Sequence, residues 1–221
     1  MNQTQKTKIS SRIGRPRLEE SGEVNARILA AATELFLSKG VAATSCEAVV
    51  ARAQVGKASL YSRYSGKDAL FEAVIKHAVE SGSFQMDATN LPEGTVRERL
   101  AFAGKAVLMQ ALSPVPLELL RLFLTEARRF PDLIAHVDSM ARSKVVDIVA
   151  RSMTASPQDA ASRKAVAIAE RFLDLTFAPI ILAALTGRAT STSSDAIERQ
   201  IAFALDILER SGPLEDALSP Q

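Results

Sequence analysis

The sequence contains few cysteines and histidines, the residues that form disulfides and bind metals. Cys46 is its one cysteine, so no disulfide can form within the chain, which fits a reducing compartment. Cys46 falls at an apolar position of a short helical pattern, and we expect it in the core. The two histidines, His77 and His136, lie far apart and lack the spacing of metal ligands. We therefore expect no metal site and no cofactor.

Long apolar runs are also missing. The longest one, from Leu173 to Leu185, is interrupted by Asp174 and Pro179, and it is shorter than the about 20 helical residues that span a bilayer. The polar N-terminus lacks the apolar segment of a secretory signal. We expect a soluble, cytoplasmic protein with no membrane partner.

Signatures of catalysis are absent as well. The sequence has no Gly-rich phosphate loop, no G-x-S-x-G and no H-E-x-x-H. We therefore expect a protein that is not an enzyme. An all-α enzyme acting on a small molecule remains an alternative, as does an adaptor that binds another protein through its basic N-terminal part.

Charge is present but unevenly distributed. The chain has 27 Lys and Arg against 25 Asp and Glu, yet residues 1–67 hold 11 basic and 5 acidic side chains. Residues 68–221 hold 16 basic and 20 acidic ones. A basic head on an acidic body indicates that only the head meets a polyanion.

Helical periodicity covers the rest of the sequence, and strand alternation is missing. An apolar face runs from Glu23 to Gly40, where a left-handed cap favours glycine. The order of Thr44 and Glu47 has the form of a capping box at the start of a short second helix. We expect an all-α fold, with further helices at Thr95–Leu112, Pro116–Arg129, Asp132–Met153, Asp159–Thr186 and Ser194–Arg210 and with a kink at Pro179.

Two short helices around the break at residues 54–56 follow the plan of a helix-turn-helix. In the second of them, over residues 57–64, Leu60 and Tyr64 are expected to face inward. The outward side chains would then reach base edges and phosphates in the major groove. These candidate DNA-binding residues are Lys57, Ala58, Ser59, Tyr61, Ser62, Arg63 and Lys67.

The N-terminal arm supplies a second candidate contact. Arg12, Arg15 and Arg17 surround a Gly-Arg-Pro segment, of the kind that inserts arginine into a narrow minor groove. We expect a flexible basic arm over residues 1–21, a helix-turn-helix DNA-binding domain over 22–67, and a helical regulatory and dimerisation domain over 68–221.

Residues 26–75, ARILAAATELFLSKGVAATSCEAVVARAQVGKASLYSRYSGKDALFEAVI, resemble the DNA-binding domain of the TetR (tetracycline-repressor-like) transcriptional regulators. The resemblance implies that Tyr61 and Lys67 touch phosphates and that Thr44 and Ser45 join them. It also implies that the protein represses transcription and that its partner is a DNA operator. Residues 119–137, LLRLFLTEARRFPDLIAHV, resemble a segment found in one subset of the same family.

The sequence departs from the family pattern at the turn. Gln54 stands where the pattern has glycine, so a glutamine would have to adopt the left-handed conformation at some cost. Gly56 replaces a residue that caps the recognition helix. These changes leave DNA binding as the expectation.

The resemblance further implies a two-fold homodimer through the last two long helices and a palindromic operator. The expected dimer residues are Ile168, Leu175, Leu182, Ile197, Ile201, Leu205 and Leu208, for which burial in the protomer is the alternative. A small apolar or amphipathic effector would release the operator by binding the two states of the protein with different affinity. The expected pocket residues are Phe84, Phe102, Met109, Leu120, Leu124 and Phe172, for which a place in the bundle core is the alternative.

Overall fold

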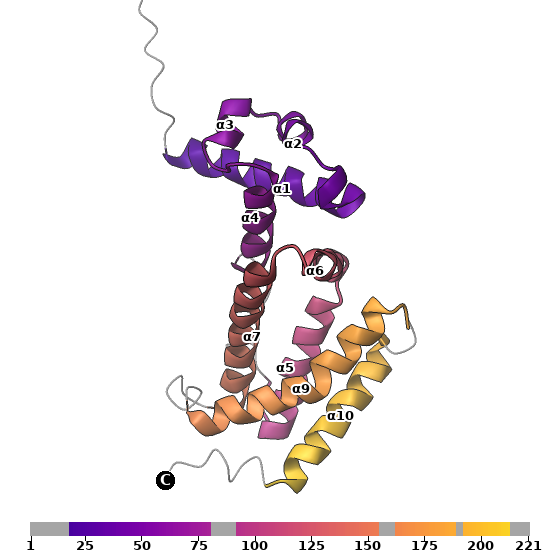
Figure 1. Cartoon of the computed structure of the whole chain (residues 1–221). Helices are drawn as coiled ribbons and strands as arrows, with labels where there is room; N and C mark the ends of the chain where they lie inside the picture. The colour runs from indigo at the N-terminus through magenta and orange to yellow at the C-terminus, as the bar shows by residue number, and fades with distance from the viewer. Residues whose placement is uncertain (1–17, 81–91, 155–161, 189–191, 213–221) are drawn as a thin grey trace, which may run out of the picture.

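The computed structural model describes residues 18–80, 92–154, 162–188 and 192–212, and every regular element in these ranges is a helix (Figure 1). The predicted all-α fold is therefore confirmed. The helices are α1 (Leu18–Ala43), α2 (Cys46–Ala53), α3 (Lys57–Tyr61), α4 (Lys67–Glu80), α5 (Val96–Ala111), α6 (Pro114–Glu126), α7 (Pro131–Met153), α9 (Arg163–Leu185) and α10 (Ser194–Arg210).

The first helix starts earlier than its apolar face suggested. It begins at Leu18, within the range predicted for the arm. Arg12, Arg15 and Arg17 lie outside the described residues. At Gly40 the helical path is interrupted, with φ 79° and ψ 164°, a conformation that favours glycine.

The second helix begins one residue later than predicted. Ser45 is its N-cap, and the Ser45 side chain accepts a hydrogen bond from the backbone N–H of Ala48. The capping box predicted for Thr44 and Glu47 is therefore wrong. The Thr44 hydroxyl is buried and donates instead to the carbonyl oxygen of Gly40, at 2.8 Å.

Helices α1 to α4, in the upper part of Figure 1, pack around one core that also takes in Phe123 of α6 and Leu133 and Val137 of α7. Phe36 of α1 and Phe71 of α4 meet edge to face with ring centroids 5.9 Å apart, and Leu60 of α3 is fully buried beside them. This packing explains how a five-residue helix such as α3 persists, since it is too short to be stable alone. Because this core also reaches into α6 and α7, the domain boundary predicted at residue 67 stays a prediction.

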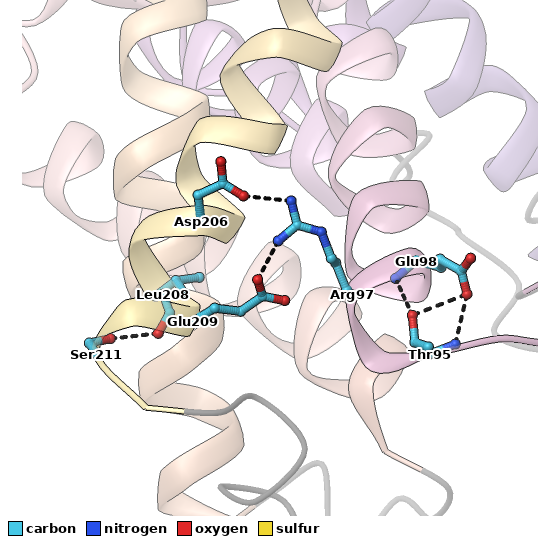
Figure 2. Close-up of polar contacts among 7 residues, drawn as sticks. All are labelled: Thr95, Arg97, Glu98, Asp206, Leu208, Glu209 and Ser211. Atoms are coloured by element: carbon cyan, nitrogen blue, oxygen red, sulfur yellow. Dashed lines mark hydrogen bonds and ion pairs between the residues drawn. The ribbon is translucent and has the colours of Figure 1, made fainter.

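The second core belongs to α5, α7, α9 and α10, which form the lower part of the molecule (Figure 1). Figure 2 shows how α5 is fixed at its N-terminal end: Thr95 and Glu98 form a capping box, with each side chain bonded to the other's backbone N–H. From the same turn, Arg97 reaches Asp206 at 2.7 Å and Glu209 at 2.6 Å, and so ties α5 to α10.

Two local features let α5, α9 and α10 approach closely. A Cβ atom at Gly104 of α5 would lie 2.5 Å from the ring of Phe172 in α9, so only glycine fits there without movement. Pro179 of α9 has no N–H to bond to the carbonyl oxygen of Leu175, one turn earlier. The side-chain amide of Gln200 in α10 donates to that oxygen at 2.7 Å and satisfies it.

Among the described residues, no single helix is long and apolar enough to cross a membrane. Helices α5 and α6 pass that test only as a pair, and they are bent by 69° at the break between them.

Candidate nucleic-acid interface

The helix-turn-helix presents a row of polar side chains on α3. Lys57, Ala58 and Ser62 are exposed, and Tyr61 keeps 47% of its surface open to solvent. Ser59 is half-buried. The helix ends at Tyr61 rather than at residue 64 as predicted, and a turn continues from Ser62. The recognition helix is thus shorter than its sequence pattern indicated, but its exposed face carries the predicted residue types.

The two tyrosines of this stretch have different surroundings, as predicted. Tyr64 is half-buried against the N-terminal core, and its hydroxyl donates to the side-chain oxygen of Asn25 at 2.6 Å. Burial raises the pKa of Tyr64. Tyr61 points outward, where the Glu47 carboxylate raises its pKa. Tyr61 therefore remains a protonated hydrogen-bond donor, as contact with a phosphate oxygen requires.

Glu47 is a residue whose role the sequence pattern obscured. Its carboxylate does not form the predicted capping box. It accepts a hydrogen bond from the Tyr61 hydroxyl at 3.4 Å and lies 3.8 Å from the Lys57 ammonium. It joins the N-terminal turn of α2 to both ends of α3. Thr44 and Ser45 are both able to cap a helix, so the local sequence carried no signal that Glu47 does not close a capping box.

The remaining candidates differ in how available they are. Lys67, in the first turn of α4, donates to the carbonyl oxygen of Ala42 at the end of α1, at 2.8 Å. Arg63 donates to the carbonyl oxygen of Ser59 at 2.7 Å. Ser45 is exposed, but Thr44 is 3% exposed. The expectation that the Thr44 side chain reaches DNA is corrected, because its hydroxyl is hydrogen-bonded to the carbonyl oxygens of Leu35 and Gly40.

The turn between α2 and α3 places Gln54 in the left-handed conformation, which is unfavourable for a residue other than glycine. Gln54 has φ 53° and ψ 47°, and it is the only non-glycine residue with positive φ in the described parts of the chain. Its backbone N–H bonds to the carbonyl oxygen of Ala51, which closes α2. Gly56 is the N-cap of α3 and offers no side-chain cap.

Cys46 packs in the core, and burial raises the pKa of its thiol, as expected for a structural cysteine.

A cavity of about 1240 Å³ lies between the helix-turn-helix and the body. Its walls come from α1, α4, α5, α6, α7 and α9. Leu29, Thr33 and Leu37 of α1 line one side. Leu120 of α6 and Phe177 of α9 line others, so the cavity touches the helix that carries the DNA-binding core as well as the regulatory helices.

The predicted pocket residues need correction. Of the described ones, only Leu120 lines this cavity. Phe172 is fully buried in the second core against Gly104, and Phe102, Met109 and Leu124 are exposed on the surface. Phe84 lies outside the described residues. Periodicity predicts which face of each helix is apolar, but it does not predict where neighbouring helices leave a cavity between them.

The predicted dimer residues also divide. Four of them, on α10, are buried in the protomer's own core and are not free to form an interface: Ile197, Ile201, Leu205 and Leu208. Ile168 and Leu175 are half-buried against the same core. Leu182 of α9 is 56% exposed, and Phe203 of α10, which was not predicted, is 55% exposed.

Metal binding finds no support in the ranges that the structure describes, where no group of three or more His, Cys, Asp or Glu side chains is arranged to hold an ion.

Comparisons with known proteins agree with this architecture. The family model of bacterial regulatory proteins, tetR family, matches residues 28–74, which span the N-terminal core. The HTH-type transcriptional repressor Rv3405c of Mycobacterium tuberculosis is 28% identical over 183 residues, covering 80% of this chain and 88% of the relative. A TetR-family transcriptional regulator from Mesorhizobium loti superposes with a TM-score of 0.69 at 19% identity, covering 86% of this chain and 97% of that one.

The flavonoid-responsive regulator FrrA superposes with a TM-score of 0.60 at 25% identity, over 86% of this chain and 97% of its own. The family model covers the helix-turn-helix, whereas the sequence match to the repressor and the structural matches extend over the helical body. The family is one of transcriptional regulators, which are in general not enzymes. The chain belongs to the TetR family and is a helix-turn-helix, DNA-binding transcriptional regulator.

Proposed function

We propose that the protein is a dimeric repressor that binds a palindromic operator and is released from it by a small apolar or amphipathic effector. The observation that carries this proposal is the position of the cavity. Its walls include α1, whose buried residues pack on α2 and α4, together with α6, α7 and α9 of the body. A ligand there would contact both parts of the molecule and would favour one arrangement of them over the other.

The DNA contacts in this proposal divide into three groups. Lys57, Ala58 and Ser59, at the start of α3, face the base edges. The phosphate contacts are Ser45, Tyr61, Ser62, Arg63 and Lys67. The arm inserts Arg12, Arg15 and Arg17 into the minor groove. The exposure of Lys57 and Tyr61 supports this division, since both side chains are open to solvent without DNA.

The dimer would form through the outer face of α9 and α10. Leu182 and Phe203 are large apolar side chains that are more than half exposed on these helices. Pairing of two copies there would place two α3 helices to read half-sites separated by roughly 34–36 Å, one turn of DNA. Sedimentation of wild-type protein and of a Leu182→Glu, Phe203→Glu double variant tests this, and an unchanged mass would contradict it.

A relative named as a repressor and another named as flavonoid-responsive support the direction of regulation and the kind of effector. Planar aromatic compounds are therefore the first to screen. The test is a fluorescence-anisotropy titration with duplex from the region upstream of the protein's own gene, at two salt concentrations, with a scrambled duplex as control. We expect tighter binding to the upstream duplex that weakens steeply with salt. Equal binding to both duplexes would contradict operator recognition.

A further inference from the structure

Among the residues that the structure describes, the ionisable side chains that line the cavity are not balanced in charge. They are Glu34 of α1, His77 of α4, Asp138 and Arg142 of α7, and Asp174 of α9. Three are carboxylates and one is a guanidinium. Which of them a ligand can use depends on the partners that they already have.

Two of the carboxylates are already paired. Glu34 lies 2.7 Å from the guanidinium of Arg52, which belongs to α2 and is not part of the cavity wall. Asp174 lies 2.9 Å from Arg142, and this ion pair connects α9 to α7. The pair occupies the one guanidinium of the cavity lining, so an anionic ligand would have to displace Asp174 to reach it.

Asp138 is the exception. It lies one helical turn before Arg142 on α7, but Arg142 is directed to Asp174 instead. No hydrogen bond or ion pair joins Asp138 to any part of the chain that the structure describes. Its α7 neighbours in the lining, Val137, Ala141 and Val145, are apolar. Asp138 is exposed, so an unpaired and hydrated carboxylate stands at the edge of a largely apolar space.

We infer that the cavity takes an amphipathic cation, with an apolar body between α1 and α6 and an ammonium or amidinium group against Asp138. This inference rests on the proposed function, because it names the chemical class of the effector. The apolar body would contact Leu29, Leu120, Phe123 and Phe177. The volume of about 1240 Å³ leaves room for an elongated apolar body.

The test uses probes that share a biphenyl body and differ in one end group: aminomethyl, hydroxymethyl or carboxylate. Calorimetry on the full chain gives the affinity of each. We expect the amine to bind about fivefold more tightly than the alcohol, because a partly exposed ion pair contributes modestly, and the carboxylate to bind most weakly. Asp138→Asn should remove the difference between amine and alcohol. Asp132→Asn, on the same helix but outside the cavity wall, is the matched control and should leave it unchanged.

Tightest binding of the carboxylate, no binding of any probe, or an unchanged preference for the amine in Asp138→Asn would each overturn the inference. Release of bound operator duplex, measured with the same probes, separates it from the proposed function. An amine that binds through Asp138 without releasing duplex would support the site and contradict the effector role. Release by the carboxylate but not by the amine would support the effector role and overturn the charge assignment.

Discussion

The hydroxyl of Tyr61 and the carboxylate of Glu47 are joined by a hydrogen bond of 3.4 Å across the helix-turn-helix. The same carboxylate lies 3.8 Å from the ammonium of Lys57. Two proposed DNA contacts therefore share an acidic partner while no DNA is bound. A phosphate or base must compete with Glu47 for both donors, and the negative charge of Glu47 repels phosphates in general.

Replacing Glu47 with glutamine should raise affinity for DNA, and more for scrambled duplex than for operator. We expect an increase of about threefold to tenfold on scrambled duplex, because one exposed like charge is removed and Lys57 is released. Anisotropy titrations at two salt concentrations measure both affinities. Glu34→Gln, in the same domain and also paired with a basic residue, is the control and should change neither. Weaker binding of Glu47→Gln to scrambled duplex would contradict the prediction.

Tyr61→Phe and Lys67→Ala should weaken binding to all duplexes alike. Each removes one proposed phosphate contact, worth about 1 kcal/mol or roughly fivefold in affinity, and the lysine change should also reduce the salt dependence by about one phosphate. Thermal melting must accompany the titrations, because the Lys67 ammonium also bonds to the end of α1. A loss confined to one sequence would contradict phosphate contact.

Lys57→Ala and Ser59→Ala should instead change sequence preference. Their side chains lie at the start of α3, where a helix in the major groove meets base edges. Selection of preferred duplexes from a randomised pool, compared between wild type and each variant, measures the change. An equal loss of affinity on every sequence would move these residues to the phosphate group.

Gln54→Gly should stabilise the folded protein by about 1 kcal/mol, because an L-residue in the left-handed region carries a penalty of roughly that size. Urea unfolding gives the free energy. Gln54→Ala retains a Cβ atom and is the matched control, with little change expected. If glycine and alanine shift the midpoint equally, the left-handed conformation is not the source of the strain.

Gly104→Ala should destabilise the body by about 1–3 kcal/mol through overpacking against Phe172. Gly22→Ala, inside α1 where an added Cβ meets open space, is the control and should not destabilise the protein. Adding Phe172→Leu to Gly104→Ala should recover part of the loss by making room for the new methyl group. Additive losses in that double variant would show that the two residues do not compete for space.

Local signals in the sequence predicted most of the fold. The start of α10 at Ser194, the breaks at Gly40 and Gln54, and the separate surroundings of Tyr61 and Tyr64 all depend on residues within a few positions of one another. Periodicity and turn chemistry report such local features. The capping of α2 failed by a single residue, because Thr44 and Ser45 are both able to cap a helix and only packing decides between them.

The cavity and the dimer face were harder to predict because both depend on how helices are placed around one another. Phe172 was expected in a pocket, but Gly104 on another helix receives its ring. Ile197 and Leu205 were expected at a dimer interface, but α10 turns them into its own core. A helical pattern identifies the apolar face of a helix, and which partner covers that face is a property of the assembled bundle.

Because α1 forms part of the cavity wall, substitutions that change which effector binds should also change DNA binding in the absence of effector. Leu29 is 5% exposed because it packs in the core under the helix-turn-helix, and it also borders the cavity. A substitution there that widens the space for a new inducer also loosens the scaffold beneath α2 and α4. Substitutions in α1 that change which effector binds should therefore also alter expression of the controlled gene before any effector is added. Substitutions of Phe177 in α9 should leave that basal expression nearly constant.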